Sequence, residues 1–286
     1  MTATGTTTPG QVPGRLSDVL ELDRRGAANR CQWLRGSLSN PPAASRQAAV
    51  EIVADAAVRW QCRGALQHYD AWSQAVEHGT QLPPDQSRKL APFIRPAFGL
   101  PARQLPADHL QGHVAEYVWY ILAQENLPDG LTLRAIEGPS FSVTTPGGDG
   151  LAVYQRNDAV LVFRLSEIKK HESGMHLSRT VARAYKQLDK NAEVYLAELT
   201  TLAERYDADI ARLYAALSDL WIDRDERAGA GVAVSTSDGS LPTRCFGTMH
   251  STFPDLSVEQ LDGLVVALGD FSAFAEGVRD QVWSAL

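Results

Sequence analysis

The feature that most constrains the fold is a pair of apolar segments joined by a short polar turn. Residues 149–155 and 159–169 are rich in β-branched and other apolar side chains, and Arg156-Asn157-Asp158 lies between them. Such segments are typical of strands, and so short a connection requires the two strands to run antiparallel. The sequence therefore predicts a β-hairpin, around which the rest of the fold has to be built.

Other segments alternate between strand and helix patterns. Strands are expected at 131–136, 141–145, 149–155, 159–169 and 229–235. Helices are expected from 108 to about 126, from 178 past 206 with one break before 221, and from 257 past 271. Asp108 with Gln111, and Ser257 with Gln260, have the spacing of capping boxes and predict where two of these helices begin.

The part of the chain before residue 108 has a different character. Apolar side chains recur at helical spacing over 16–78, with an interruption at Asn40-Pro41-Pro42. Six prolines between 83 and 106 predict an extended linker. We therefore expect a disordered leader (1–14), an α-helical N-terminal region with a proline-rich linker (15–107), and a second domain (108–286).

Tryptophan is concentrated in the helical part of the chain. Trp33, Trp60 and Trp72 are expected to form helical core rather than surfaces on which bases stack. Tryptophan and valine side chains that the helical region leaves uncovered would favour a protein partner or a homo-oligomer.

Two carboxylates are expected to meet at one end of the hairpin. Asp149 opens the first strand and Glu167 lies near the end of the second, so antiparallel pairing brings them together. Lys169 projects on the same side as Glu167, because side chains alternate along a strand. Two converging carboxylates repel each other unless a cation lies between them, and Mg²⁺ prefers oxygen ligands. Such a site suits phosphoryl chemistry, because Mg²⁺ polarises a phosphoryl oxygen and acidifies an attacking water.

A third carboxylate lies within an apolar run. Glu116 is the only ionisable side chain other than tyrosine in 114–122. Burying an unpaired carboxylate is costly, so Glu116 needs a partner or a metal. We expect it to face Asp149 and Glu167, with His113 one turn earlier on the same helix face. The alternative is a carboxylate at the helix surface.

These residues resemble the PD-(D/E)XK nuclease superfamily, whose members have the restriction-endonuclease-like fold. The resemblance spans about 108–235, with Glu116 on the first helix, Asp149 at the start of the second core strand, and Glu167-x-Lys169 on the third. It implies an α/β fold with a central mixed sheet flanked by helices, preceded here by the α-helical N-terminal region.

The resemblance also implies a function. The chain would be a Mg²⁺- or Mn²⁺-dependent endo- or exonuclease that cleaves phosphodiester bonds of nucleic acid, with DNA favoured. The residues implied to bind metal or catalyse are Asp149, Glu167, Ile168 (through its carbonyl), Lys169 as the catalytic lysine, and Glu116 as an auxiliary ligand. Gly148 stands where the name motif has proline, and Asn191, after Gln187, stands where one branch of the superfamily has tyrosine.

Three short segments are similar to the nuclease subunit of Hachiman-type antiviral systems. They are Gly112-x-x-x-Glu116, Gly148-Asp149-Gly150 and Glu167-Ile168-Lys169, the last followed by an alanine-rich segment. This similarity implies a role in bacterial antiphage defence together with a helicase partner. The alternative is that Glu167 and Lys169 are a solvated strand end and that 148–150 is only a turn.

The charge is distributed unevenly along the chain. The whole sequence has 27 basic and 34 acidic residues, a net charge of −7, which argues against binding nucleic acid through global charge. Residues 156–190, however, carry +4, whereas 191–286 carry −10. The basic residues expected to bind nucleic acid are Lys170, Arg179, Arg183, Lys186 and Lys190. The acidic part supports the alternative of a catalytically inactive, nuclease-fold scaffold or interaction subunit of a defence complex.

Nothing in the sequence predicts a membrane protein. No run of about 18 apolar residues is present, and residues 1–11 lack the apolar core of a signal peptide. We therefore expect a cytoplasmic protein that does not bind membranes.

Overall fold

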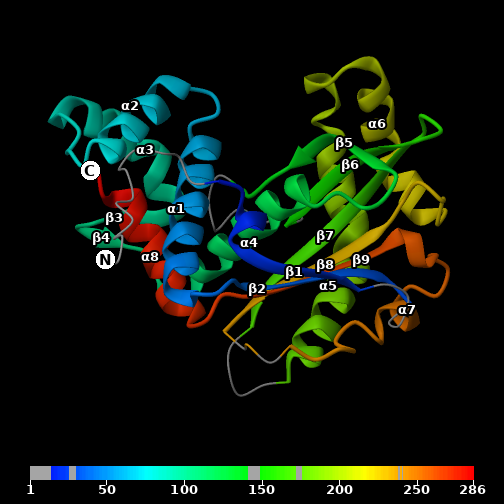
Figure 1. Cartoon of the computed structure of the whole chain (residues 1–286). Coiled ribbons are helices and arrows are strands. Elements are labelled where there is room, and N and C mark those ends of the chain that lie inside the picture. The colour runs from blue at the N-terminus through cyan, green and yellow to red at the C-terminus, as the bar shows by residue number, and fades with distance from the viewer. Residues whose placement is uncertain (1–13, 26–29, 141–148, 172–175, 238, 240) are drawn as a thin grey trace.

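The computed structural model describes residues 14–25, 30–140, 149–171, 176–237, 239 and 241–286 (Figure 1). The strands are β1 (Leu20–Arg25), β2 (Gln32–Leu38), β3 (Gly99–Leu100), β4 (Arg103–Gln104), β5 (Leu131–Glu137), β6 (Gly150–Arg156), β7 (Leu161–His171), β8 (Ala230–Thr236) and β9 (Leu261–Ala267). The helices are α1 (Pro42–Gln61), α2 (Leu66–Glu77), α3 (Pro84–Phe98), α4 (Ala107–Glu125), α5 (Leu177–Thr200), α6 (Ala208–Ile222), α7 (Met249–Thr252) and α8 (Phe271–Trp283). Within the described residues, no helix combines the length and hydropathy that crossing a bilayer requires.

Seven strands form one mixed sheet in the order β1-β2-β9-β8-β7-β6-β5. The four strands β2, β9, β8 and β7 are parallel to one another, and the outer strands pair antiparallel at both edges. Parallel strands are normally covered on both faces, so their sequences are continuously apolar. Accordingly, every residue of β8 is buried.

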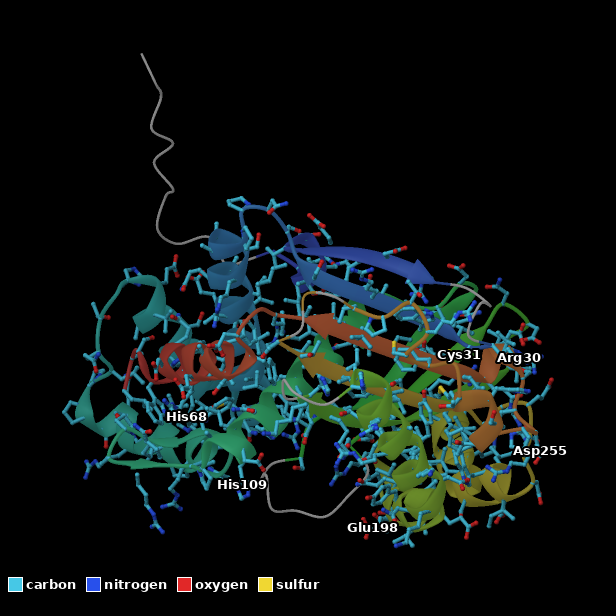
Figure 2. The ribbon with its side chains drawn as sticks, turned by 90° about the horizontal axis from the view of Figure 1, so that it is seen from below. Arg30, Cys31, His68, His109, Glu198 and Asp255 are labelled. Atoms are coloured by element: carbon cyan, nitrogen blue, oxygen red, sulfur yellow. The ribbon has the colours of Figure 1, made fainter. Side chains whose placement is uncertain are left out.

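Helices cover both faces of the sheet. On one face α4 packs against β7 and β8, and Ile168, Ala233 and Val266 share a core with it. The helices α1, α3 and α8 pack on α4, and Figure 1 shows them grouped beside the sheet. On the other face α5 packs on β7 and β8 and α6 packs on α5. Figure 2 shows His68 and His109 on the side of the helical group and Glu198 on the side of α5.

The fold class is confirmed: the protein is α/β, with a mixed sheet flanked by helices and with helices in its N-terminal part. The meander β5–β6–β7, the helix α4 before it, and α5 and β8 after it occur in the predicted order. The long predicted helix is broken between 201 and 207, where the 3-10 turn Ala203–Arg205 lies between α5 and α6. The predicted strand 141–145 and residues 1–13 of the predicted leader lie outside the described residues.

The prediction of helix over 16–38 was wrong. This segment forms the 3-10 turn Leu16–Asp18 and then β1 and β2, which join the same sheet as β7. Leu20 and Leu22 alternate with exposed Glu21 and Asp23, the period-two pattern of a half-buried strand. The segment forms strands rather than a helix because β2 pairs with β9, which lies far away in the sequence.

The prediction of an extended proline-rich linker was also wrong. Most of this segment is α3, which begins at Pro84 and contains Pro92 and Pro96. Proline suits the first position of a helix, but inside a helix it removes a backbone hydrogen bond. Four buried apolar side chains outweigh that loss, namely Leu90, Ile94, Ala97 and Phe98.

The final helix begins later than predicted, and a strand takes its expected place. Ser257 and Gln260 do bond, with the Ser257 amide donating to Gln260 Oε1 at 2.9 Å, but they enclose only the 3-10 turn Val258–Gln260. The β-branched run that follows becomes β9, between β2 and β8, and α8 starts at Phe271. The capping box predicted from Asp108 and Gln111 was also wrong, because α4 begins after Pro106. The side chains of Asp108 and Gln111 instead contact Lys170.

The tryptophans of the predicted helical region are largely covered. Trp72 in α2 is 2% exposed and Trp60 in α1 is half-buried, whereas Trp33 is 1% exposed but lies in β2, so its prediction as helical core was wrong. The large apolar side chains that the described residues leave exposed are Leu66, Val194 and Ile222. The expectation that uncovered tryptophans and valines would require a partner or an oligomer therefore has no basis in this surface.

Close packing of α4 on the sheet yields a first prediction. An ideal Cβ at Gly150, in β6, would lie 2.2 Å from the Trp119 ring, so we expect Gly150→Ala to lower the free energy of unfolding by about 1–3 kcal/mol. At Gly112, in the interior of α4, a Cβ would meet nothing within 4 Å, so Gly112→Ala should stabilise by up to about 1 kcal/mol. Urea unfolding of both variants measures these changes, and equal effects would contradict the packing.

Candidate active site

The register of the hairpin brings the two predicted carboxylates together. Gly150 pairs with Ser166 in the antiparallel β6–β7 ladder, so Asp149, one residue earlier, lies across from Glu167. Beyond this point β7 continues to His171 and, among the residues that the structure describes, pairs with β8 alone. Asp149, Glu167 and Lys169 therefore lie where β7 extends past the start of β6.

Direct contacts join these three side chains. Asp149 Oδ2 accepts a hydrogen bond from the Ile168 amide at 2.7 Å and lies 3.6 Å from Lys169 Nζ. Lys169 Nζ also forms an ion pair with Glu167 Oε1. The main chain thus fixes Asp149 against β7, and one ammonium group bridges the two carboxylates.

Glu167 is the most buried of the three. Its side chain is 1% exposed, compared with 21% for Asp149 and 31% for Lys169. Glu167 Oε1 is paired with Lys169 Nζ, and no backbone amide of the described residues donates to either oxygen. A buried carboxylate whose charge is offset by one ammonium group is costly, and it is suited to binding a further cation.

Burial controls the ionisation of this cluster. Burial, followed by the charge of Glu167, raises the pKa of Asp149 to about 8. Burial also raises the pKa of Glu167, although Lys169 opposes the shift. For Lys169, burial disfavours the ammonium, but Asp149 and Glu167 outweigh it and hold its pKa above the ordinary value. At neutral pH the lysine is therefore charged.

Glu116 approaches this cluster from α4. Its side chain is 20% exposed, and Oε2 lies 3.5 Å from Nδ1 of the buried His113. Burial makes the largest contribution to the raised pKa values of Asp149 and Glu167, and the negative charge of Glu116 adds to both. The structure thus brings Glu116 within electrostatic reach of the two carboxylates, although His113 is its direct partner.

The cluster provides the oxygen ligands that a hard divalent cation needs. The described residues contain no group of three or more His, Cys, Asp or Glu side chains arranged around one ion. Mg²⁺, however, is usually held by one or two carboxylates and completes its shell with water and substrate oxygens. The buried oxygens of Glu167, which lies across from Asp149, fit that requirement. The predicted main-chain ligand is the carbonyl of Ile168, which lies between Glu167 and Lys169 in the sequence.

The predicted nucleic-acid-binding residues fall into two groups. Lys170 is mostly buried, and its ammonium contacts Gln111 Oε1 at 3.0 Å and Asp108 Oδ1 at 2.5 Å, which ties β7 to α4. The other four are exposed along one face of α5, opposite its buried stripe, and are Arg179, Arg183, Lys186 and Lys190. The position of Lys170 thus suits a structural contact, whereas the α5 residues form an open basic surface.

One residue near the site was not identified from the sequence. Tyr195, on α5, is close enough for its ionisation to influence Lys169, and its hydroxyl accepts a hydrogen bond from Asn191 Nδ2 at 3.4 Å. Asn191 is the position where the resemblance would place a tyrosine. No pattern within α5 indicates Tyr195, because its proximity to Lys169 follows only from the packing of α5 on β7.

Comparison with known proteins adds no assignment, because neither protein-family models nor curated protein sequences gave a match to this chain.

The raised pKa of Asp149 leads to a prediction for the metal-free protein. The Asp149 carboxyl has a pKa of about 8 in the folded protein, compared with 3.8 in an unfolded chain that lacks these neighbours, so it binds its proton more tightly in the folded state. Its contribution to stability is present below about pH 4 and is lost as the pH rises toward about pH 8. In EDTA we therefore expect the melting temperature to fall over that range, and Asp149→Asn to flatten the fall. A parallel pH dependence in both proteins would contradict the assignment.

Proposed function

We propose that this protein is a Mg²⁺- or Mn²⁺-dependent nuclease whose reaction centre contains Asp149, Glu167 and Lys169. The observation that carries the proposal is the buried Glu167 carboxylate, which lies across from Asp149 in the hairpin and forms an ion pair with Lys169. The resemblance to the PD-(D/E)XK superfamily supports the same three residues in the same order along the chain.

Each side chain has a role that its environment favours. Asp149 and Glu167 would hold the metal, with the Ile168 carbonyl and Glu116 as further ligands. The bound ion would polarise a phosphoryl oxygen and lower the pKa of an attacking water. Lys169 is charged at neutral pH, so it is suited to orienting the water and offsetting the negative charge that develops on the phosphate, rather than to removing a proton.

The proposed substrate is nucleic acid, with DNA favoured. The exposed basic face of α5 belongs to the helix that packs on β7 and β8, and basic side chains of this kind neutralise backbone phosphates. Residues 191–286 carry −10 and would repel DNA, so we also propose a protein partner, such as the helicase that the resemblance implies in antiphage defence.

Cleavage of plasmid and single-stranded DNA in Mg²⁺ tests the reaction centre. We expect Glu167→Gln and Lys169→Gln each to lower the cleavage rate at least about 100-fold, because each removes a charge that stabilises the transition state. Glu198→Gln is a matched control, because it removes one carboxylate from the exposed surface of α5, and this variant should cleave at the wild-type rate. Equal rates for wild type and the two site variants would overturn the assigned site.

A second function, that of a catalytically inactive scaffold, is favoured by one observation. Residues 191–286 carry −10, a charge suited to docking a basic partner. In that case the carboxylate cluster would be a structural remnant that binds no metal.

Calorimetric titration with Mg²⁺ separates the two functions. A nuclease should bind the ion in a way that depends on Asp149 and Glu167, so we expect Asp149→Asn and Glu167→Gln each to weaken binding at least about tenfold. The Glu198→Gln control should bind as the wild type does. Binding that is absent, or unchanged in both site variants, would favour the scaffold.

A further inference from the structure

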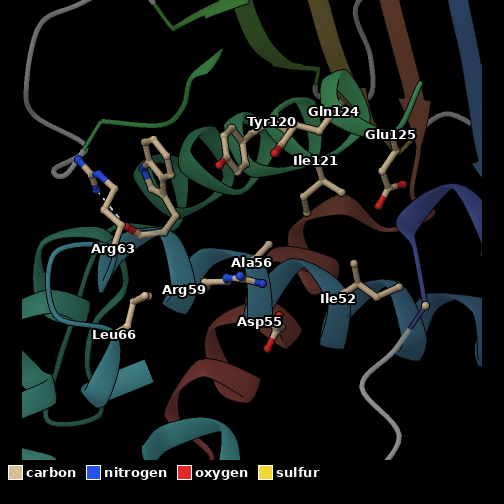
Figure 3. Close-up of a pocket in the computed structure, with 12 residues that line it drawn as sticks. Ile52, Asp55, Ala56, Arg59, Arg63, Leu66, Tyr120, Ile121, Gln124 and Glu125 are labelled. Carbon is tan, nitrogen blue, oxygen red and sulfur yellow. Dashed lines mark hydrogen bonds between the residues drawn. The ribbon is translucent and has the colours of Figure 1, made fainter. Parts of the chain in front are cut away.

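A concave surface, separate from the carboxylate cluster, lies between α1 and α4. It encloses about 600 Å³, within the range of small-molecule binding sites, and its walls come from one side of each helix (Figure 3). None of its residues belongs to the carboxylate cluster. We call it the α1–α4 groove and define it by Arg59, Trp60, Arg63, Tyr120 and Gln124.

Two arginines supply the charge of the groove. Arg59 lies in the last turn of α1 and Arg63 in the turn that follows Gln61, and both are exposed. Arg63 stacks over the Trp60 ring, 4.2 Å from its centroid, and donates to the Trp60 carbonyl at 3.0 Å. Stacking holds the guanidinium plane in place while leaving donors for an anion.

The two acidic residues of the groove are already engaged. Glu125 accepts hydrogen bonds from the amides of Leu16 and Ser17, at 3.0 and 2.7 Å. Asp55 accepts one from the Tyr69 hydroxyl at 2.8 Å, and burial raises the pKa of this carboxyl. Two carboxylates and two arginines thus line the groove, and because the carboxylates already accept hydrogen bonds, the arginines are the groups suited to binding an anion.

Aromatic rings form the other part of the wall. Trp60 and Tyr120 lie 4.9 Å apart between ring centroids, and both are half-buried, so each keeps some exposed ring surface. The Trp60 indole donates to the Pro139 carbonyl at 2.8 Å, which fixes its orientation. Aromatic rings beside arginines are the combination that binds nucleobases and phosphates together.

The groove and the carboxylate cluster are neighbours along α4 and along the chain. Tyr120 follows Glu116 by one helical turn, and Gln124 follows Tyr120 by another, so the three share one side of α4. Pro139, whose carbonyl accepts the Trp60 hydrogen bond, lies just after β5, and Asp149 lies just before β6, so the two sites are close in sequence.

We infer that the α1–α4 groove binds a nucleotide unit, with its phosphate on Arg59 and Arg63 and its base against Trp60 and Tyr120. The nucleotide belongs to a single strand that also reaches the carboxylate cluster. A base within a duplex is already stacked between its neighbours and has no face free for Trp60 or Tyr120. This inference rests on the proposed function for the origin of the strand, but binding itself requires no cleavage.

Fluorescence anisotropy of a short fluorescein-labelled oligothymidylate, with the full chain in EDTA, tests the groove without any reaction. We expect Arg59→Gln/Arg63→Gln to weaken binding at least about tenfold and to reduce the slope of log affinity against log salt by about 1.4, as for two lost phosphate contacts. Arg88→Gln/Lys89→Gln removes the same charge from the exposed surface of α3 and should bind as the wild type does.

A competition arm distinguishes the strand from a free nucleotide. Thymidine 5′-monophosphate should displace the oligothymidylate only at much higher concentration if the strand is the ligand. Displacement at an equal concentration would support the same nucleotide chemistry with a free nucleotide as its source. Binding that is identical in wild type and Arg59→Gln/Arg63→Gln overturns the inference.

The two proposals fail separately. Cleavage that depends on Glu167, together with unchanged oligothymidylate binding by Arg59→Gln/Arg63→Gln, would remove the groove and leave the nuclease. Binding that depends on the two arginines, in a protein that cleaves nothing in Mg²⁺ or Mn²⁺, would leave the groove and remove the nuclease.

Discussion

Enclosing the charge of Glu167 is the constraint on which the candidate site depends. A carboxylate with so little exposed surface needs opposite charge nearby, and the sheet supplies it from the same strand two residues later, as Lys169. Asp149 can join them because Gly150 lets the Trp119 ring lie against the first residue of β6. Charge, strand register and the packing of α4 are therefore one arrangement, and a change in any of them disturbs the other two.

The parts predicted correctly are those that local patterns determine. The hairpin register follows from a short turn and period-two alternation, so the meeting of Asp149 with Glu167 was predictable from the sequence. The helix α4 and the exposed basic side of α5 were predictable for the same reason. The proximity of Glu116 and His113 was predictable from their spacing on α4, but the burial of His113 depends on α3 and α1 packing around its ring.

The parts predicted wrongly depend on residues distant in sequence. The short strand patterns of β1 and β9 also fit helical spacing, and pairing with distant strands decides between the two, as when β9 inserts between β2 and β8. The helix α3 tolerates two prolines because its apolar stripe packs on the helical layer, which no local rule includes. Trp60 was assigned to the core because the sequence does not show that Tyr120 and Arg63 leave part of its ring uncovered.

The position of β9 has a consequence for how the protein folds. The hairpin β1–β2 ends at Leu38 and can join the sheet only through β9, which begins at Leu261. Closing so long a loop is entropically costly, so a topology of this kind folds slowly compared with one built from local contacts. The strand β8 carries the edge that β9 covers, and until β9 is in place this edge presents unpaired backbone groups. Assembly of the sheet beside the carboxylate cluster is therefore complete only when β9, far along the chain from β2, has inserted between β2 and β8.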